Sequence, residues 1–226
     1  YTTLKQLATD EVNVCTIEDP IEMIEGAFNQ MQVQSNIDLT FASGVRALMR
    51  QDPDIIMVGE IRDLETAEMA IQAALTGHLV LSTLHTNDAP SAITRLRDMG
   101  IEPFLIASCL RGVLAQRLVR RLCGCAVAHP LQAAERELWP ELAALDSTYH
   151  AVGCEQCQGS GYIGRLGLYE FIELDAGLIG LLYDGASELA MQDYLADRRQ
   201  SLVAMASDCL ARGETSLAEV LRVVQG

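Results

Sequence analysis

Lysine is nearly absent from this chain of 226 residues: Lys5 is the single lysine, and the other fifteen of the sixteen basic residues are arginines. The basic residues are outnumbered by 31 acidic ones, which leaves a formal net charge of −15. An acidic surface repels phosphate groups, so we expect no general binding to nucleic acid and no direct binding to anionic lipid. The simplest interpretation of this charge is the acidic surface of a soluble protein.

Long apolar runs are lacking as well. None approaches the ~20 apolar residues that a membrane-spanning helix needs, although half of all residues are apolar. The first residues do not show a basic segment followed by an apolar one, which is the pattern of a secretory leader. We therefore expect a soluble, cytoplasmic protein with one core and a small additional module, which touches membranes only through partners.

Cysteine occurs seven times, an odd count, and four of the seven stand in two close pairs. In a chain without a leader, such pairs indicate a metal site before a disulfide. Cys154 and Cys157 have the C-x-x-C spacing that places two thiolates on one zinc ion, and a second pair completes a tetrahedron. That second pair, Cys123 and Cys125, is one residue closer than usual, and Gly124 between them permits the tighter turn. We predict Zn²⁺ at these four cysteines; the alternative is four reduced cysteines without a metal.

His129 follows the first pair and is a candidate substitute ligand. Cys15, Cys109 and Cys209 have apolar neighbours and are predicted to belong to the core. The segment Gly159–Gly164 fits the pattern G-x-G-x-x-G, but a dinucleotide site needs that motif between a strand and a helix. Here it follows a cysteine pair and leads into a predicted strand, so tight turns in a metal module explain it better.

Strand and helix patterns alternate through the first half of the chain. The expected elements are, in order, a helix at 3–9, a strand at 12–17, loops to about residue 38, a helix from Thr40, a strand at 55–58, a helix from Asp63, a strand at 78–84, a helix from Asn87 or Asp88, and a long amphipathic helix over 104–122. Such alternation predicts a doubly wound α/β sheet, whose ligands bind outside the carboxyl ends of the strands.

The second half shows a different pattern. Its cysteine pairs flank a predicted helical insert over Leu131–Leu145. One more strand is expected over Arg165–Leu174, and short amphipathic helices over 176–226 with a break at Gly213.

Acidic residues follow two of the predicted strands. Glu18 and Asp19 end the first, and closely spaced carboxylates repel each other unless a cation lies between them. Glu60 ends the apolar run 55–58, where an acid on a rigid strand can hold Mg²⁺ beside a triphosphate. The alternatives are a solvated acidic turn and an ordinary strand end.

Two histidines bracket the third strand of the predicted sheet. His78 and His85 are seven residues apart and face opposite sides of a strand, so they cannot form one simple metal site. The functional interpretation is a sensor of the γ-phosphate at the strand end. The alternative is one histidine at the edge of the core and one in a loop.

Together these features resemble the Asp box, Walker B box and His box of the ATPases of type II secretion and type IV pilus assembly, in order and spacing. The matching stretches are IEDPIE, RALMRQDPDIIMVGEIRDLETAEMAIQAALTGHLVLSTLHTNDAPSAITRL, DMGIEPFL, LAQRLVRRLC and GCEQCQGSGYIGRLGLYE. The resemblance covers nearly the whole chain, and RQDPDIIMVGEIRD is its most specific part. Among these ATPases the chain resembles the type II secretion motors, the general secretion pathway E family, most closely.

This resemblance implies roles for the polar residues. Glu18 would polarise the attacking water, Glu60 would hold Mg²⁺ through water, and His85 together with His78 would sense the γ-phosphate. Residues assigned to ATP and Mg²⁺ binding are Asp19, Glu60 and Arg62. The implied architecture is an α/β RecA-like ATPase core over 1–122, a four-cysteine zinc module over 123–162, and a last core strand with a helical C-terminal segment over 163–226.

The chain departs from the family in one respect. The family's phosphate loop has the form G-x-x-x-x-G-K-[ST], in which backbone amides and the lysine hold the phosphates. No glycine precedes Lys5 here, and Tyr1–Leu4 resembles the helix that follows the loop. We therefore expect a chain trimmed just after its phosphate loop, without the family's N-terminal domain and inactive by itself.

The resemblance also implies a function for the parent protein. It would be a homo-hexameric ATPase on the cytoplasmic face of the inner membrane, where it couples ATP hydrolysis to pseudopilus assembly and protein export through inner-membrane platform proteins. Two alternatives remain: a type IV pilus assembly ATPase, or a non-catalytic zinc-binding scaffold if the phosphate loop is absent from the parent. The cysteine module argues against a pilus retraction motor, which by resemblance lacks it.

Overall fold

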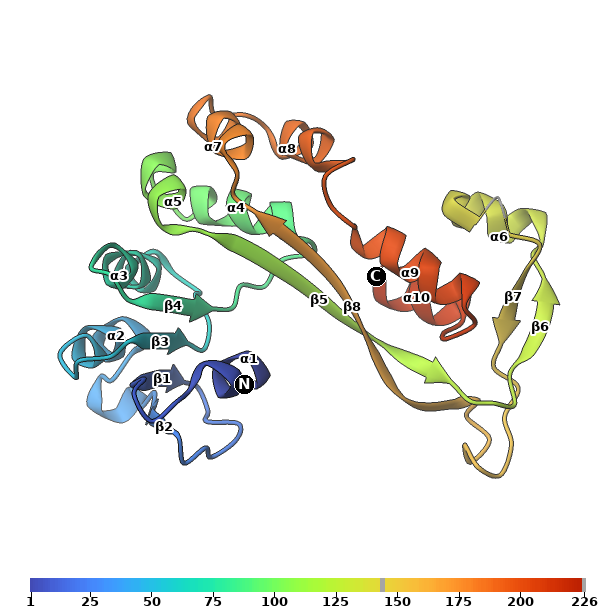
Figure 1. Ribbon diagram of the computed structural model, residues 1–226, viewed down its shortest axis with the longest axis horizontal. Helices are drawn as coiled ribbons and strands as arrows, with labels where there is room; N and C mark the ends of the chain where they lie inside the picture. Colours follow the sequence, from blue (N-terminus) through green and yellow to red (C-terminus); the bar gives the residue numbers. More distant parts are fainter. Residues whose placement is uncertain (143–144, 225–226) are drawn as a thin grey trace. The chain divides into compact units, whose positions relative to one another are not determined.

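The computed structural model describes residues 1–142 and 145–224, which divide into two compact units (Figure 1). The first unit comprises Tyr1–Thr86, Pro90–Arg111 and Leu174–Glu188; the second comprises Asn87–Ala89, Gly112–Glu173 and the chain from Leu189 on. Within the described residues, no helix is both long enough and apolar enough to cross a bilayer.

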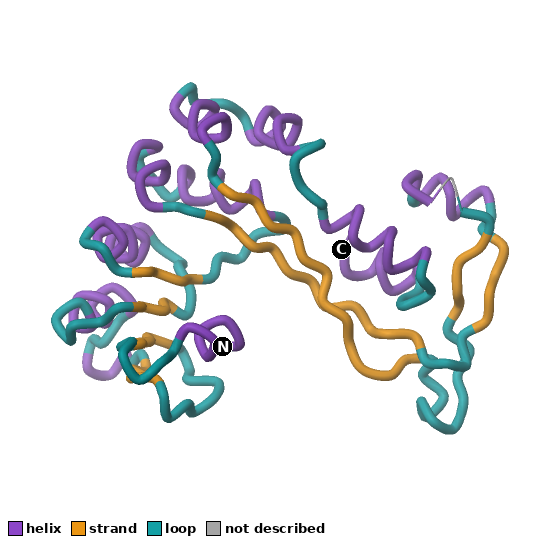
Figure 2. The backbone as a smooth tube through the Cα atoms, viewed as in Figure 1, coloured by secondary structure: helices purple, strands orange, loops and turns teal. Residues whose placement is uncertain are grey.

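A four-stranded parallel sheet forms the centre of the first unit (Figures 1 and 2). Its strands lie in the order β2-β1-β3-β4. Their bounds are β1 Val14–Glu18, β2 Phe28–Gln32, β3 Ile55–Val58 and β4 Leu79–Ser82. The helices of this unit are α1 Thr2–Leu7, α2 Phe41–Leu48, α3 Leu64–Leu75, α4 Ala89–Asp98, α5 Pro103–Cys109 and α7 Ala176–Tyr183, with a 3-10 turn at Ser35–Ile37. The predicted α/β class with a parallel sheet and flanking helices is confirmed.

Helices cover both faces of this sheet. On one face Leu4 of α1 packs with Val14, Phe28 and Ile55. On the other face α2 lies so close that a Cβ on its Gly44 would come within 2.7 Å of Ile17. Successive residues of a strand point to opposite faces, so β1 contributes Val14 to one layer and Ile17 to the other.

Two predicted N-caps hold their helices as expected. The Thr40 side chain accepts a hydrogen bond from Ser43 N, and Ser43 Oγ accepts one from Thr40 N, which makes a capping box at the start of α2. Asp63 accepts a hydrogen bond of 2.8 Å from Thr66 N at the start of α3. This second cap fixes the chain directly after Glu60 and Arg62.

The strand β2 was not predicted. The segment between the first strand and about residue 38 was expected to form loops. It lies at the edge of the sheet and pairs with β1 alone, from Val14↔Phe28 to Glu18↔Gln32. Because an edge strand is only partly buried, its polar Asn and Gln residues give no continuous apolar run.

The second unit contains two antiparallel pairs. The strands β5, Gly112–Leu122, and β8, Tyr162–Glu173, form a long two-stranded ribbon, and β6, Val127–Pro130, pairs with β7, Ser147–His150. The remaining elements are α6 Ala133–Leu138, a 3-10 turn at Pro140–Leu142, α8 Glu188–Leu195, α9 Leu202–Ala211 and α10 Leu217–Val224. Its core gathers Val119, Trp139, Leu142, Leu168, Leu210 and Val220.

The predicted helix over 104–122 is wrong beyond its first turns. α5 ends at Cys109, and Gly112–Leu122 is the strand β5. Burial there alternates with a period of two: Val119 is fully buried, whereas Leu118 and Arg120 are exposed. Pairing with β8 decides the conformation of this segment. The local sequence does not reveal that pairing, because β8 lies some fifty residues further along the chain.

Other expectations in the second half hold in part. The insert over Leu131–Leu145 is helical at α6 and the following 3-10 turn, and residues 143–144 of that expectation lie outside the described residues. The strand expected over 165–174 is β8, but it pairs with β5 and not with the four-stranded sheet. Short helices are confirmed over 176–224, with Gly213 at a φ of 67° between α9 and α10, and residues 225–226 of that expectation lie outside the described residues.

Candidate functional site

The ends of β1 and β3 bring the two predicted acids to one edge of the sheet. Ile17 lies opposite Val58 in the parallel register, so Glu18 and the segment Gly59-Glu60 follow at the same edge. Gly59 N donates to Ile17 O at 2.8 Å. A Cβ at Gly59 would lie 3.1 Å from Ile17 O and 3.3 Å from the Cα of Glu18, which explains a glycine before the acid.

Glu18 is a buried carboxylate with three side-chain donors. Only 3% of the residue is exposed. It accepts hydrogen bonds from Thr16 Oγ1 at 2.6 Å, from Gln30 Nε2 at 3.2 Å and from the hydroxyl of Tyr1. Burial, followed by the bond to Glu18, raises the pKa of Tyr1 to about 12. The carboxylate is therefore held in a fixed orientation at the end of β1.

Glu60 lies between two basic side chains. Arg62 Nη2 donates to its Oε1 at 2.5 Å, and Nε2 of His85 lies 3.2 Å from its Oε2. The hydrogen bond from Arg62 is the largest cause that lowers the pKa of Glu60, with a smaller contribution from His85. The acid is thus held ionised next to groups that can bind anionic oxygens.

A surface hollow adjoins this group. It has a volume of about 260 Å³, and its lining residues are Ile61, Arg62, Leu84, His85 and Arg95. The side chain of His85 is 88% exposed, so its ring is presented to solvent. Two arginines and a histidine line this opening, and the Glu60 carboxylate is bonded to Arg62 and His85, so the group suits a divalent cation together with a phosphate.

The other residues predicted for this site, Asp19 and His78, lie outside the group of Glu60, Arg62 and His85. Asp19 follows Glu18 in an exposed turn with a cis peptide bond to Pro20. The bond to Glu60 raises the pKa of Arg62, and the charge of Asp19 adds to that effect. His78 lies at the amino end of β4, the opposite edge from His85, and its Nδ1 donates to Ala73 O at 2.8 Å. The structure therefore brings Glu60, Arg62 and His85 together and leaves His78 away from them.

Some residues of this site were missed in the sequence. Tyr1, Thr16 and Gln30 bind Glu18, and Arg95 lines the hollow. Thr16 could have been found, because two residues along a strand share a face. Gln30 could not, since its position follows from the unpredicted pairing Thr16↔Gln30.

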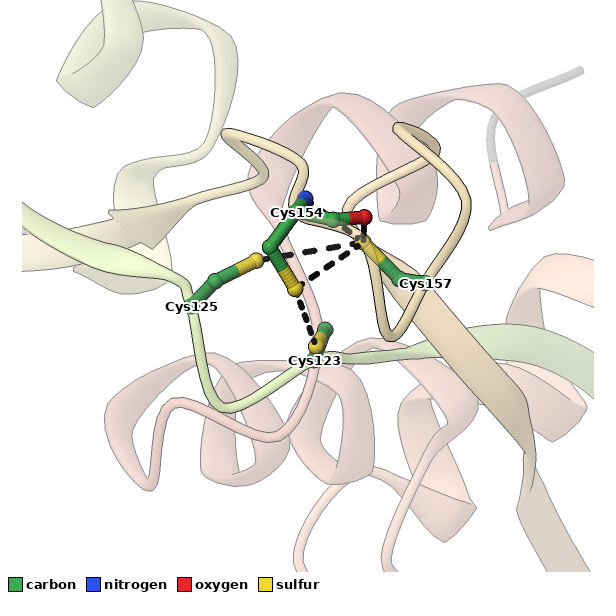
Figure 3. A group of neighbouring side chains, drawn as sticks. All are labelled: Cys123, Cys125, Cys154 and Cys157. Carbon is green, nitrogen blue, oxygen red and sulfur yellow. Dashed lines mark hydrogen bonds between the residues drawn. The ribbon is translucent and has the colours of Figure 1, made fainter.

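Four cysteines of the second unit converge from two loops (Figure 3). The Sγ–Sγ distances are 3.8 Å for Cys123–Cys154, 3.9 Å for Cys125–Cys157 and 3.7 Å for Cys154–Cys157. Four sulfurs around a zinc ion with Zn–S bonds of ~2.3 Å lie ~3.8 Å apart in a tetrahedron. A disulfide would need a separation of about 2 Å. The four residues thus fit zinc, and the close Cys-Gly-Cys pair reaches the group fully.

Backbone amides also act on this cysteine cluster. Cys154 N and Gly161 N lie 3.1 and 3.2 Å from Sγ of Cys157. Burial opposes ionisation of Cys157, but these amide bonds and the neighbouring thiols outweigh it and lower its pKa to about 6. Burial raises the pKa of Cys125, and hydrogen bonds with the thiols of Cys123, Cys154 and Cys157 raise it further. One thiolate forms readily, while a further charge needs a cation.

Glycines shape the second loop of the cluster. Gly153 and Gly161 have φ values of 101° and 76°, and a Cβ on either would come within 2.5 Å of a neighbouring residue. Gly161 directly precedes β8, so the G-x-G-x-x-G segment leads from a turn into a strand, as predicted.

His129 belongs to a different group, with Glu135 and His150. Of the remaining cysteines, Cys15 and Cys209 are core residues, and Cys109 is partly buried.

Comparison with known proteins places the chain in a family. The model of the type II/IV secretion system protein family matches residues 1–222. The type IV pilus assembly ATPase TfpB of Acinetobacter baylyi is 57% identical over 99% of this chain and 39% of its own length. Type II secretion system protein E of Aeromonas hydrophila is 49% identical over the whole chain and 45% of its own length. The chain thus spans less than half the length of these relatives.

Solved structures agree with this result. The pilus retraction motor PilT with bound ADP superimposes with a TM-score of 0.71 at 26% identity, over 98% of this chain and 55% of that one. The ATPase DotB of Legionella pneumophila, at 24% identity and a TM-score of 0.68, covers 96% of this chain and 53% of its own, and supports the fold. By its sequence and its RecA-like fold, this chain belongs to the type II/IV secretion system protein family.

Proposed function

We propose that this chain is part of the motor of a hexameric ATPase that drives pseudopilus assembly and protein export in type II secretion. The observation that carries the proposal is the group Glu60, Arg62 and His85 at the carboxyl edge of a parallel sheet, beside a hollow of about 260 Å³. This edge is where α/β sheets bind ligands. The relatives named above are a secretion protein and pilus ATPases.

Each acid has a role in this proposal. Glu60, ionised at the end of β3, would hold Mg²⁺ through water, and the exposed His85 would contact the γ-phosphate. Glu18, fixed by three donors, would polarise the attacking water. Arg62 and Asp19 would contribute to binding ATP and Mg²⁺, Arg62 through the phosphate oxygens and Asp19 through the cation. For His78, the contact with Ala73 O supports a role in holding the α3–β4 connection, and its part in sensing phosphate stays a prediction.

Zinc has a structural role in this proposal. The four cysteines would hold Zn²⁺ with no ligand position left for water, which is the arrangement of structural rather than catalytic sites. The site would tie together the loop before β6 and the loop after β7.

The three proposed domains keep the bounds 1–122, 123–162 and 163–226. The hexamer, the inner-membrane platform as partner and the location at the cytoplasmic face of the membrane are part of the same proposal.

A type IV pilus assembly motor is the second candidate. The observation in its favour is the identity of 57% with a pilus assembly ATPase, against 49% with a type II secretion protein. The two functions separate by complementation. The full-length gene, placed in a strain that lacks its secretion motor and in one that lacks its pilus motor, should restore enzyme export in the first. Restoration of pili alone would favour the second candidate.

A matched variant tests whether either function depends on ATP hydrolysis at this site. The full-length protein carrying Glu60→Gln should fold and fail in complementation, because the amide cannot hold Mg²⁺ as a carboxylate does. Glu65→Gln, an exposed acid on α3, serves as the control and should complement normally. Normal complementation by Glu60→Gln would favour the non-catalytic scaffold.

A further inference from the structure

Three residues that commonly bind transition metals meet at the β6–β7 hairpin of the second unit. His129 lies on β6, His150 on β7 and Glu135 on α6. One ring nitrogen from each histidine and one carboxylate oxygen all lie within 4.8 Å of one another. All three side chains are partly buried. The group shares no residue with the four cysteines.

Strand pairing brings the two histidines together. His129 lies opposite Thr148, and His150 is two residues further along β7, so both side chains point to the same face of the hairpin. Their ring centroids are 4.1 Å apart. Nε2 of His150 lies 3.6 Å from Oε1 of Glu135. The donors thus come from three segments that are already adjacent, and to bind one zinc ion they would draw together from within 4.8 Å to the ~3.3 Å that separates nitrogen and oxygen ligands of a tetrahedral site.

Hydrogen bonds around Gln132 determine which nitrogen of His129 carries a lone pair. The side-chain oxygen of Gln132 accepts from the backbone N–H of Glu135 in a capping box, so its Nε2 is the amide nitrogen. That nitrogen lies 3.3 Å from Nε2 of His129. An amide nitrogen only donates, and therefore Nε2 of His129 accepts. An unprotonated imidazole nitrogen is the form that binds a metal, so an ion bound at Nε2 of His129 would replace the hydrogen bond from Gln132.

Glu135 is oriented by the same capping box. Its Oε2 accepts from Gln132 N at 2.9 Å, which leaves Oε1 toward His150. Metal-binding carboxylates are usually held by a hydrogen bond of this kind. Two histidines and one glutamate with a water in the fourth position make a known zinc ligand set, and the net charge of −15 favours a cation.

We propose that His129, Glu135 and His150 bind a second Zn²⁺ ion, separate from the one assigned to the cysteines. The ion would clamp α6 onto the β6–β7 hairpin. Cys125 precedes β6 and Cys154 follows β7, so the hairpin would carry one metal at its base and another along its strands. Because nitrogen and oxygen donors replace four thiolates, the second ion should dissociate first on dialysis.

The test is a zinc titration of the dialysed protein, followed by NMR of ¹⁵N-labelled histidine side chains. The chain contains four histidines, so each can be assigned by single substitution. One further equivalent of zinc should bind, and the resonances of His129 and His150 should shift while those of His78 and His85 do not. Binding of no further equivalent, or shifts at His78 or His85 alone, would overturn the proposal.

Variants separate metal binding from folding. His129→Gln, His150→Gln and Glu135→Gln should each weaken the second equivalent by at least about 10- to 100-fold, the cost of losing even an outer-shell partner. Glu135→Gln keeps an acceptor for the helix cap, and His85→Ala is the matched control that should keep full binding. Thiolate-to-cobalt absorption of Co²⁺-loaded variants verifies that the cysteine cluster remains folded. Retention of the second equivalent in all three variants would refute this ligand set.

Discussion

Replacing Glu219 with glutamine should destabilise the second unit by about 2–3 kcal/mol at pH 7. Glu219 lies on α10 with a fully buried side chain and receives hydrogen bonds from two arginines. Arg120 on β5 donates through its backbone N at 2.9 Å and its Nη2 at 2.7 Å. Arg222 donates through Nη2 at 2.7 Å. The substitution leaves both arginines facing a neutral amide. Arg120 lies near the end of β5, shortly before the loop that carries the first cysteine pair.

The expected magnitude follows from the pKa of this carboxyl group. Burial alone would raise the pKa of Glu219, but the bonds from Arg222 and Arg120 outweigh it and hold the pKa at about 2, against 4.5 for an unperturbed glutamate. That difference corresponds to roughly 3 kcal/mol of stabilisation of the charged form. The side chains of Arg120 and Arg222 are 47% and 60% exposed, and water screens part of the effect.

The same pKa predicts the pH dependence. Since the pKa in the folded protein lies below that in the unfolded chain, the stabilisation is fully present above about pH 4.5 and is lost as the pH falls toward 2. Wild type and Glu219→Gln should therefore differ most near neutral pH. Their free energies of unfolding should converge as the pH approaches 2.

Urea unfolding followed by tryptophan fluorescence measures this effect in the right part of the molecule. Trp139 is the single tryptophan and packs in the same core as Val220 of α10. Glu137→Gln, an exposed acid on α6, is the matched control and should change the free energy of unfolding by less than about 0.5 kcal/mol. A Glu219→Gln variant as stable as this control at pH 7, or a difference that grows toward acid pH, would refute the reasoning.

Three further predictions concern the cysteine cluster, the activity of this chain and the cap of α3. After purification without metal-affinity resin and dialysis, elemental analysis should find about one zinc per chain. Chelation should expose the thiols of Cys123, Cys125, Cys154 and Cys157 before Trp139 fluorescence changes, and four freely titratable thiols in the untreated folded protein would exclude the site. The 226-residue chain alone should release no phosphate from ATP, because it holds Glu18, Glu60 and His85 but no amide cradle with a lysine, and stabilisation of phosphoryl charge is the largest contribution in such chemistry; release that Glu60→Gln abolishes would contradict this. Asp63→Ala should cost about 1 kcal/mol in thermal or urea unfolding through loss of the bond to Thr66 N, and an unchanged stability would show that the cap contributes nothing.

The sequence predicted the elements whose cause is local. The apolar run 55–58 became β3, and Thr40 and Asp63 cap the helices assigned to them. It failed where pairing partners distant in sequence decide the conformation. Residues 112–122 contain enough apolar and arginine residues to fit a helix, yet pairing with β8 makes them a strand. β2 escaped notice because an edge strand needs few apolar residues.

The candidate site shows the same division. Parallel topology alone places the acids that end strands at one edge of the sheet. The spacing of the two cysteine pairs predicts that they form a cluster. The sequence placed His78 and His85 at the two ends of one strand, and the structure confirms this, with His78 directly before β4 and His85 after it. Contacts such as Gln30 with Glu18 arise from strand register, which single residues do not reveal.

The most direct test of the central claim compares two variants of the full-length protein in one assay of Mg²⁺-dependent phosphate release. Glu18→Gln keeps the shape of the side chain and should reduce hydrolysis by roughly 10²-fold or more while ATP still binds, as expected for loss of a general base. Glu60→Gln should instead raise the Mg²⁺ concentration that hydrolysis requires, because the amide is a poorer partner for the hydrated ion. Near-normal turnover in Glu18→Gln, with an unchanged response to Mg²⁺ in Glu60→Gln, would contradict the assignment of this sheet edge as the ATPase site.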